Sequence, residues 1–432
     1  METKLVRIAE ISATSKHPIF TSVYHLINED MLKQCHKELD GNKAVGIDKV
    51  TKDEYGKNLD RNIKELVQRL KNKSFKPLPS LRVYIPKGNG KKRPLGIASY
   101  EDKIVQMAVK KILGAIYEPR FLNCMYGFRP NRGCHEAIKE VYQRISYGKI
   151  SYIVDADIKG FFDHIDHDWM MKFLEWNIQD KNLLWLIRKY LKAGIMEQGK
   201  FEPTEEGSAQ GSVMSPMLAN IYMHHVLTLW FKLVVQREMQ GECFLVNFAD
   251  DFVAGFQYKW EAENYYKLLK ERMEKFGLQL EDSKSRLLQS GAYIARAKQK
   301  SGECIRLQTF DFLGFTFYCG RSRKGMPYIM PKTSSKKFRQ KIRDIKVWLY
   351  ANRDQPLKKL MGMLNLKLIG HYRYYGISFN GRMISNYKQQ VRELLFKVLN
   401  RRSDRKSYTR EGFIEVLKYY PLAMPKIYVS LF

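Results

Sequence analysis

The chain has 432 residues, 44% of them hydrophobic and 13% aromatic, so it is long enough for two or three domains and apolar enough to fold. Lys and Arg number 75 against 45 Asp and Glu, which leaves a formal net charge of +30. Such an excess argues against a typical small-molecule enzyme and favours a protein that handles a polyanion, with nucleic acid as the leading partner.

The positive charge is concentrated towards the C-terminal end. Residues 321–432 contain 26 Lys and Arg and 6 Asp and Glu, a net charge of +20, and leave +10 for the first 320 residues. Tyrosines and other apolar residues lie among the basic ones, as in GHYRYYGISF (370–379). We therefore expect this region to grip a polyanion; the alternative is a solvated basic surface that only aids solubility.

The cysteines and the N-terminal residues indicate the compartment. Six cysteines are scattered without a CxxC pair or histidines at zinc-finger spacing, so we expect neither a disulfide frame nor a zinc site. The first 20 residues lack the apolar core of a signal peptide, and no stretch reaches about 18 apolar residues. We expect a soluble protein of a reducing cytoplasm, with no membrane partner.

The first third of the chain alternates helices with a pair of strands. Residues 1–80 are predicted to be helical, with a loop at 41–51. Residues 81–97 read as two short strands around a Gly- and Lys-rich turn. A helix is predicted over 101–122, with apolar residues spaced by four at Ile104, Ala108, Ile112 and Ile116.

The middle third contains the strands that carry acidic residues. A strand is predicted within 150–162, ending before Gly160, and 244–256 reads as strand, tight turn, strand. Between them, a loop leads into a helix for which Ser215 is the predicted N-cap, with Pro216 in the first turn. The buried face of that helix is predicted to hold Leu218, Ile221, Tyr222 and Val226. A further helix is predicted over about 260–276.

The last third is predicted to be helical after a short strand at 310–317. Residues 334–350 form an amphipathic pattern whose wet side is cationic and whose apolar positions are Phe338, Ile342, Ile345 and Leu349. The order of the elements predicts an α+β fold with a sheet that carries the acidic residues.

The stretch VNFADDFV (246–253) places Asp250 and Asp251 together at the turn. Paired carboxylates at a strand turn, with a third on another strand, suit a site that holds two Mg²⁺ ions about 4 Å apart for phosphoryl transfer. Asp157 is the natural third ligand, and the carbonyl of Ile158 is a further candidate. The alternative is a polar hairpin turn. Asp155 and Asp163 lie nearby but are weaker candidates.

Seven blocks, in order, resemble those of a reverse transcriptase of the bacterial group II intron type. They read RPLGIASYEDKIVQMAVKKIL, YGFRPNRGCHEAI, DADIKGFFDHIDH, AQGSVMSPMLANIY, FADD, KSRLL and FDFLGFTF. LIGHYRYYGISFN and YPLAMPKIYVSL resemble the thumb, or maturase, region of that family. The resemblance extends from about residue 40 to the end. No segment that resembles the family's DNA endonuclease module follows the thumb.

The resemblance implies a right-hand polymerase fold, with fingers and palm built on antiparallel sheet and followed by a helical thumb. It implies an N-terminal extension and the start of the fingers over 1–80, fingers and palm over 81–320 and a basic thumb or maturase domain over 321–432. It also implies that Asp157, Asp250 and Asp251 are catalytic and bind metal.

Other positions take roles from the same resemblance. The residues implied to form the dNTP pocket are Lys87 and Arg93 at the triphosphate, Phe162 under the sugar, Gln210 and Gly211 behind the nascent base pair, and Lys284 as a proton donor to pyrophosphate. Each basic one has an alternative as an ordinary surface residue, and Phe162 as a core residue. Nucleic-acid contacts are expected from Arg129, Arg132, Lys336, Lys337, Arg339, Arg343, His371, Tyr372 and Arg373.

Two residues depart from the family pattern. Phe248 stands where the catalytic quartet usually begins with Tyr, and Ser212 stands where Gly is common. We expect the first departure to affect the primer strand or fidelity, and the second to affect the pocket behind the template, with metal binding unchanged.

The resemblance implies an RNA-directed DNA polymerase that uses two Mg²⁺ ions, with Mn²⁺ as a substitute, to extend a DNA primer with dNTPs on an RNA template. A group II intron RNA is a further expected partner, and the oligomeric state is open. One alternative is an RNA-binding maturase whose polymerase activity is secondary. Another is a domesticated, stand-alone enzyme of repair or phage defence. A template-dependent RNA polymerase is disfavoured by Phe162.

Overall fold

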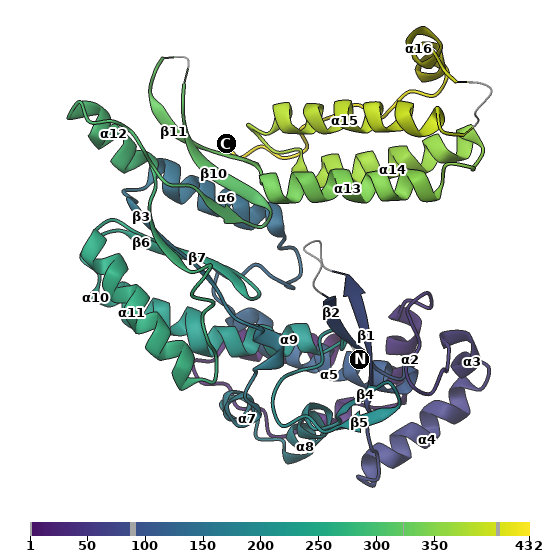
Figure 1. Cartoon of the computed structure of the whole chain (residues 1–432). Coiled ribbons are helices and arrows are strands. Elements are labelled where there is room, and N and C mark those ends of the chain that lie inside the picture. The colour runs from purple at the N-terminus through teal and green to yellow at the C-terminus, as the bar shows by residue number, and fades with distance from the viewer. Residues whose placement is uncertain (1, 87–91, 323, 403–406) are drawn as a thin grey trace.

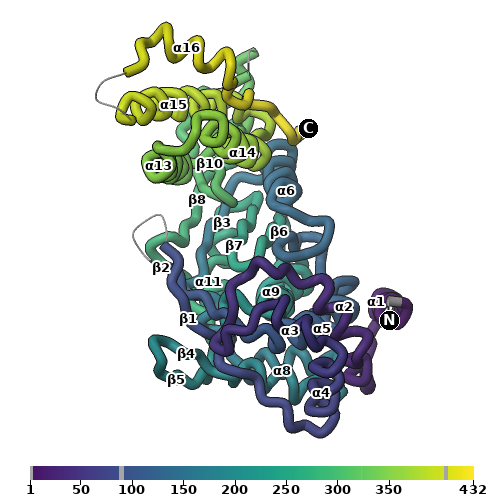
Figure 2. Tube along the Cα trace, turned by 90° about the vertical axis from the view of Figure 1, so that its right-hand side faces the viewer, coloured from purple at the N-terminus to yellow at the C-terminus, as the bar shows by residue number. Residues whose placement is uncertain are grey.

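The computed structural model describes residues 2–86, 92–322, 324–402 and 407–432. Three parts follow one another along the chain and stack in space, with N-terminal helices and a small sheet at one end, a larger sheet in the middle and a helical bundle at the other end (Figures 1 and 2). This mixture of helices with antiparallel strands, followed by a helical C-terminal part, confirms the α+β prediction.

The N-terminal part is helical, as predicted. Its elements are α1 (Glu2–Thr14), η1 (Tyr24–Leu26), α2 (Glu29–Glu38), α3 (Lys52–Gly56) and α4 (Leu59–Lys71). The predicted loop at 41–51 separates α2 from α3. Thr51 starts α3 with a capping box, in which its hydroxyl accepts from the Glu54 amide and the Glu54 carboxylate accepts from the Thr51 amide.

The first sheet is an antiparallel pair with two short added strands. The predicted strands are β1 (Ser80–Pro86) and β2 (Lys92–Ile97), paired antiparallel. β4 (Ile195–Glu197) joins β1 in parallel and continues to β5 (Lys200–Glu202). The following helix, α5 (Tyr100–Tyr117), is capped by Ser99 and buries completely the four residues that were spaced by four.

The central sheet has the strand order β6-β7-β3-β8, with every neighbouring pair antiparallel. Its strands are β3 (Tyr152–Asp157), β6 (Cys243–Phe248), β7 (Asp251–Phe256) and β8 (Arg286–Gln289). α6 (Cys134–Tyr147) and α11 (Lys259–Lys275) pack against this sheet. The same stretch of chain also forms η2 (Glu118–Arg120), η3 (Phe161–Asp163), α7 (His167–Glu175), α8 (Lys181–Leu191) and α12 (Ala292–Lys300). The predicted strand, turn and strand at 244–256 are confirmed.

Both faces of this sheet are buried, in two different cores. Val154 and Ala254 belong to a core shared with the N-terminal part, whereas Ile153 and Val253 belong to a core shared with the C-terminal helices. Because side chains alternate along a strand, Asp155, Asp157 and Asp251 share the face of Ile153 and Val253. The acidic residues therefore lie on the side of the sheet that faces the C-terminal helices.

The helix after the loop at 207–214 is longer and more irregular than predicted. It consists of α9 (Ser215–Met223), the π-helical segments η4 (His224–Thr228) and η5 (Phe231–Val235), and α10 (Gln236–Glu238). Met214 is its N-cap and Ser215 its first residue, so the N-cap prediction is wrong by one position. The Ser215 hydroxyl instead donates to the Ala209 carbonyl inside the protein.

The same helix, Ser215–Glu238, is long and apolar enough to cross a membrane by length and composition. Polar residues such as Asn220, His224 and His225 interrupt its apolar residues, so the sequence contains no continuous apolar stretch here. Its apolar window is 67% buried within the protein, which is the behaviour of a core helix.

The C-terminal part begins with a sheet that crosses a predicted boundary. Residues 310–317 form two strands, not one, because a turn at Leu313 and Gly314 separates β9 (Phe310–Phe312) from β10 (Phe315–Arg321). β10 then pairs with β11 (Pro327–Thr333), so the predicted division at 320/321 falls inside a hairpin. The helices are α13 (Ser335–Ala351), α14 (Leu357–Tyr375), α15 (Gly381–Leu399) and α16 (Arg410–Tyr419).

Candidate active site

Three aspartates meet at one end of the central sheet. Asp157 is the last residue of β3 and lies opposite Asp251, the first residue of β7, in the strand register. Asp250 lies in the two-residue turn between β6 and β7, where Ala249 has a φ of 57°. The turn thus places Asp250 beside the Asp157–Asp251 pair.

Two aspartates at this sheet end, Asp251 and Asp155, have raised pKa values. Burial, together with the nearby Asp250, Asp157 and Asp155, raises the pKa of Asp251 to about 7, although the residue stays open to solvent at the strand end. Burial also raises the pKa of Asp155 to about 6, against the opposing effect of its ion pair with Arg286 at 3.3 Å. A cation at this sheet end would relieve that repulsion.

Lys284 already meets one of these carboxylates. Its Nζ donates to Oδ2 of Asp157, and that bond raises the pKa of Lys284. The Glu281 amide donates to the Asp157 carbonyl at 2.8 Å, which ties the loop before β8 to the end of β3. The resemblance placed Lys284 near the triphosphate, and the structure places it at the aspartates.

The donor set suits a hard divalent cation, because carboxylate oxygens are what Mg²⁺ binds in proteins. Asp157 and Asp251 present such oxygens at strand ends, and Asp250 presents them in the turn beside these two residues. Ile158 lies next to them in an isolated bridge with Leu280 and is buried. Among the described residues, no three His, Cys, Asp or Glu side chains are yet gathered closely enough to hold an ion. Lys284 occupies Oδ2 of Asp157, which is one of the two oxygens that this carboxylate could offer to an ion.

The residues predicted to surround the nucleotide lie on neighbouring loops. Phe162 is half-buried in η3, with its ring against Phe161 at 5.3 Å between centroids. The Gly96 amide of β2 donates to the Gln210 carbonyl at 2.7 Å. Gly211 has a φ of 113°, and a Cβ there would lie 2.8 Å from the Gly96 carbonyl oxygen. A side chain at 211 is therefore excluded by the strand behind it.

The two basic residues of the β1–β2 hairpin differ in what the structure describes. Arg93 is exposed on β2 and pairs in register with Ile85. Lys87 lies outside the described residues. Both roles stay predictions.

Ser212 and Phe248, the two departures from the family pattern, are both at least partly buried. The Ser212 hydroxyl donates to Oε1 of Gln106 at 3.0 Å, and the Val213 amide donates to the same oxygen. Ser212 is thus buried in a bond to α5. Phe248 is half-buried against the core shared with the thumb.

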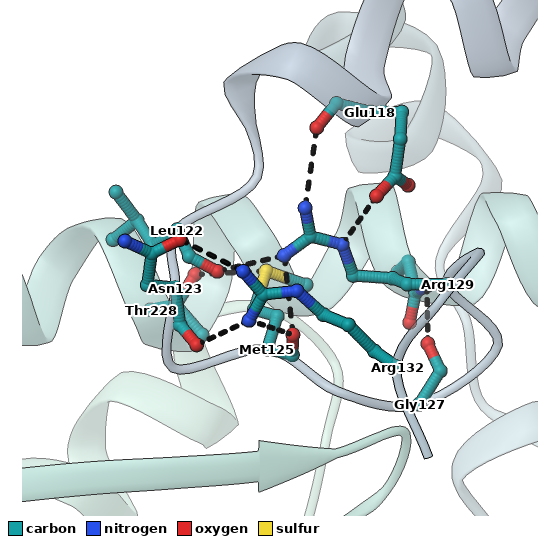
Figure 3. A network of polar contacts seen from close by, with 9 residues as sticks. Glu118, Leu122, Asn123, Met125, Gly127, Arg129, Arg132 and Thr228 are labelled. Carbon is teal, nitrogen blue, oxygen red and sulfur yellow. Dashed lines mark hydrogen bonds and ion pairs between the residues drawn. The ribbon is translucent and has the colours of Figure 1, made fainter. Parts of the chain in front are cut away.

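Arg129 lies inside the protein, so the prediction that it contacts nucleic acid is wrong, whereas Arg132 is half-buried and its role stays a prediction (Figure 3). The Arg129 side chain is 6% exposed, and its guanidinium binds the Glu118 carboxylate and the carbonyls of Leu122 and Met125. Arg132 donates to the carbonyl and side chain of Asn123. Both arginines hold their own loop, because its turns leave carbonyls that strand and helix bonds do not satisfy.

The thumb residues divide between surface and core. Those predicted to contact nucleic acid and exposed on α13 are Lys336, Lys337, Arg339 and Arg343, and Arg373 is exposed on α14. Tyr372 is fully buried, and His371 is buried with its ring stacked on Tyr387 at 3.6 Å. Burial lowers the pKa of His371 to about 3, so it is neutral at pH 7. The prediction that His371 and Tyr372 bind nucleic acid is wrong, because both lie on the inner face of α14.

One supporting residue was missed in the sequence. Asn247 is fully buried, and its Nδ2 donates to the Ala249 carbonyl at 2.7 Å, which fixes the strained turn before Asp250. A polar residue inside the apolar run LVNFA was the available signal, since buried amides need partners.

Comparison with known proteins agrees with this geometry. The reverse transcriptase (RNA-dependent DNA polymerase) family matches residues 85–317, more than half of the chain. The chain belongs to this family. Its members generally depend on divalent metal ions. The group II intron maturase-specific domain matches residues 335–414, which include α13, α14 and α15.

Individual relatives match over shorter stretches. The group II intron-encoded protein LtrA of Lactococcus lactis subsp. cremoris is 38% identical over 238 residues, which are 54% of this chain and 39% of LtrA. Protein YkfC of Escherichia coli is 37% identical over 187 residues, 43% of this chain and 49% of YkfC. An uncharacterized 91 kDa protein in a cob intron of Schizosaccharomyces pombe is 37% identical over 204 residues, which are 46% of this chain and 25% of that protein. The chain thus matches less than half the length of each.

Proposed function

We propose that this protein is an RNA-directed DNA polymerase that extends a DNA primer with dNTPs on an RNA template and uses two Mg²⁺ ions, for which Mn²⁺ can substitute. The observation that carries the proposal is the meeting of Asp157, Asp250 and Asp251 at one sheet end in a chain of the reverse transcriptase family. Asp157, Asp250 and Asp251 would hold the ions, with the Ile158 carbonyl as a further ligand.

The chemistry supplied by the bound Mg²⁺ is activation of the primer 3′-hydroxyl and neutralisation of the triphosphate and the leaving pyrophosphate. The protein's own contribution is positioning. Arg93, and Lys87 by the resemblance, would hold the triphosphate, because a transferring phosphoryl group needs fixed cations. Once the Lys284 side chain has moved away from Asp157, Lys284 would donate a proton to the pyrophosphate.

The pocket residues would select the nucleotide. Phe162, half-buried beside β3, would exclude a 2′-hydroxyl and so favour dNTPs. Gln210 and Gly211 would back the nascent base pair, and the glycine at 211 lets this loop pack closely against Gly96 of β2.

The test is extension of a labelled DNA primer on an RNA template, with and without Asp250→Ala/Asp251→Ala. The expected result is that the double variant binds the template–primer as before and extends nothing. Asp168→Ala, an exposed acidic residue in the first turn of α7, is the matched control and should extend normally. If the unmodified protein binds but extends nothing over several primers and salt concentrations, the proposal fails.

We also propose that the protein binds a group II intron RNA and assists its splicing. The support is the match of residues 335–414 to the maturase-specific domain, together with the exposed cations of α13. Such binding would use phosphates and RNA shape rather than base sequence. RNA binding and splicing that survive Asp250→Ala/Asp251→Ala would separate this role from DNA synthesis, and RNA binding no tighter than to an unrelated transcript would contradict it.

A bacterial cytoplasm is the proposed location. All six cysteines are unpaired, which suits a reducing compartment. Fractionation of the source cells tests the proposal, and recovery with an exported fraction would contradict it.

A further inference from the structure

The loop before α6 lies directly against the catalytic turn. Its Met125 forms a bridge with Asn247 of β6, and the Tyr126 amide donates to the Asn247 carbonyl at 2.8 Å. A Cβ on Gly127 would lie 2.4 Å from the Ala249 amide nitrogen. The loop backbone therefore touches the residue that immediately precedes Asp250.

This loop is held from the inside. Arg129 and Arg132 point inward to Glu118, Asn123 and loop carbonyls (Figure 3). The Asn220 side chain of α9 donates to the Gly127 carbonyl at 2.8 Å in the protein interior. With its arginines so engaged, the loop has a fixed shape, and the buried guanidinium of Arg129 is not exposed to a phosphate.

Phe128, on the same loop, has an exposed side chain. It has a φ of 58°, in the left-handed region that bulky residues avoid, and its side chain is 51% exposed. A glycine or asparagine would take this conformation with less strain. Because the ring is half-exposed, its burial contributes little stability to offset the strained backbone. Packing within the chain therefore does not explain a phenylalanine at this position.

We propose that the ring of Phe128 packs against the terminal base pairs of the template–primer duplex, beside the catalytic turn. This inference rests on the proposed function, because it requires a duplex end at the aspartates. An aromatic ring contacts bases or sugars of any sequence, which suits an enzyme that copies many templates. Phe128 is then a positioning residue that sets the primer end against Asp250.

The first test compares Phe128→Asn with Phe128→Tyr. Asparagine accepts the left-handed backbone but removes the ring, whereas tyrosine keeps it. We expect Phe128→Asn to weaken duplex binding, or raise the KM for duplex, by about tenfold, with an unfolding midpoint no lower than that of the unmodified protein. Phe128→Tyr should be close to normal. The control is Tyr147→Ala, which removes another exposed aromatic residue, 64% exposed at the end of α6.

A structural role predicts the reverse pattern. If Phe128→Asn lowers the unfolding midpoint and leaves duplex binding and KM within about twofold, the proposal is overturned. A loss of the same size in Tyr147→Ala would also overturn it, because the effect would then be common to exposed aromatic residues.

A photo-crosslink locates the contact without any catalysis. p-Benzoylphenylalanine at position 128, with duplex and no dNTPs, should crosslink within about three base pairs of the primer end, and the same residue at position 147 should not. Equal crosslinking from both positions would contradict the proposal. Because this readout needs no extension, it distinguishes failure of the Phe128 contact from failure of the polymerase function.

Discussion

The central sheet of β3, β6, β7 and β8, here called the palm, and the helices α13 to α15, here called the thumb, both carry charged residues that were predicted to act. The two regions fix those residues in different ways. In the palm, antiparallel register places Asp157 opposite Asp251, and a two-residue turn fixes Asp250. In the thumb, the outcome depends on the helix face, since Arg373 is exposed while its neighbours His371 and Tyr372 are buried. Strand neighbours therefore predict a site more reliably than residues that merely cluster along a helix.

The largest expected effect is in the palm. Asp157→Asn should lower single-nucleotide incorporation by about 10³-fold or more, because the end of β3 then loses a charged ligand. Duplex binding should change by less than about twofold, because affinity for a duplex comes from Lys and Arg that neutralise its phosphates and Asp157 is an anion. Rapid-quench incorporation and a filter-binding assay measure the two quantities, and equal losses in both would contradict the division of labour.

The next effect concerns the loop behind the palm. Arg129→Met should lower the free energy of unfolding by about 3 kcal/mol, because the partly buried Glu118 carboxylate loses its cation. The double variant Arg129→Met/Glu118→Met should recover part of that loss. Urea denaturation measures both, and a stable Arg129→Met protein with weakened duplex binding would restore the original prediction of a nucleic-acid contact.

The thumb should affect affinity rather than chemistry. Replacing Lys336, Lys337, Arg339 and Arg343 with Gln should weaken duplex binding about 10- to 100-fold and reduce the slope of log affinity against log salt by about 3. Incorporation at saturating duplex should stay near normal. A salt titration measures the slope, and an unchanged slope would mean that this face of α13 does not meet phosphates.

The smallest effect is a pH-dependent one in the palm. Folded Asp251 keeps its proton up to about pH 7, whereas an unfolded aspartate loses it near pH 4, so the folded state binds more protons between these values. The stability of the metal-free protein should therefore fall as pH rises from about 4 to 7. Asp251→Asn should remove this fall and raise the free energy of unfolding at pH 8 by about 1 kcal/mol, a small gain because solvent screens the exposed carboxylate. Thermal unfolding in EDTA measures it, and an unchanged pH profile would contradict the carboxylate repulsion.

Much of the palm could be predicted from the sequence. The apolar residues Tyr152 to Val154 before the break at Gly160, and those on both sides of Asp250, predict the strands and the turn, since local pattern and turn chemistry suffice there. The interior roles of Arg129 and His371 could not be predicted, because they depend on carbonyls and rings brought together from elsewhere in the chain. The two strands within 310–317 were read as one because a lone glycine such as Gly314 also occurs inside strands, whereas here Leu313 and Gly314 take φ values of 48° and 81° and form a turn.

The contrast between palm and thumb is tested most directly by the rate of nucleotide incorporation as a function of duplex concentration. The two proteins to compare are Asp250→Ala/Asp251→Ala and the variant with Gln at the four α13 positions. We expect no incorporation by the palm variant at any duplex concentration, and near-normal incorporation by the thumb variant once duplex saturates it. Incorporation by the palm variant at high duplex concentration would contradict the assignment of catalysis to the aspartates at this sheet end.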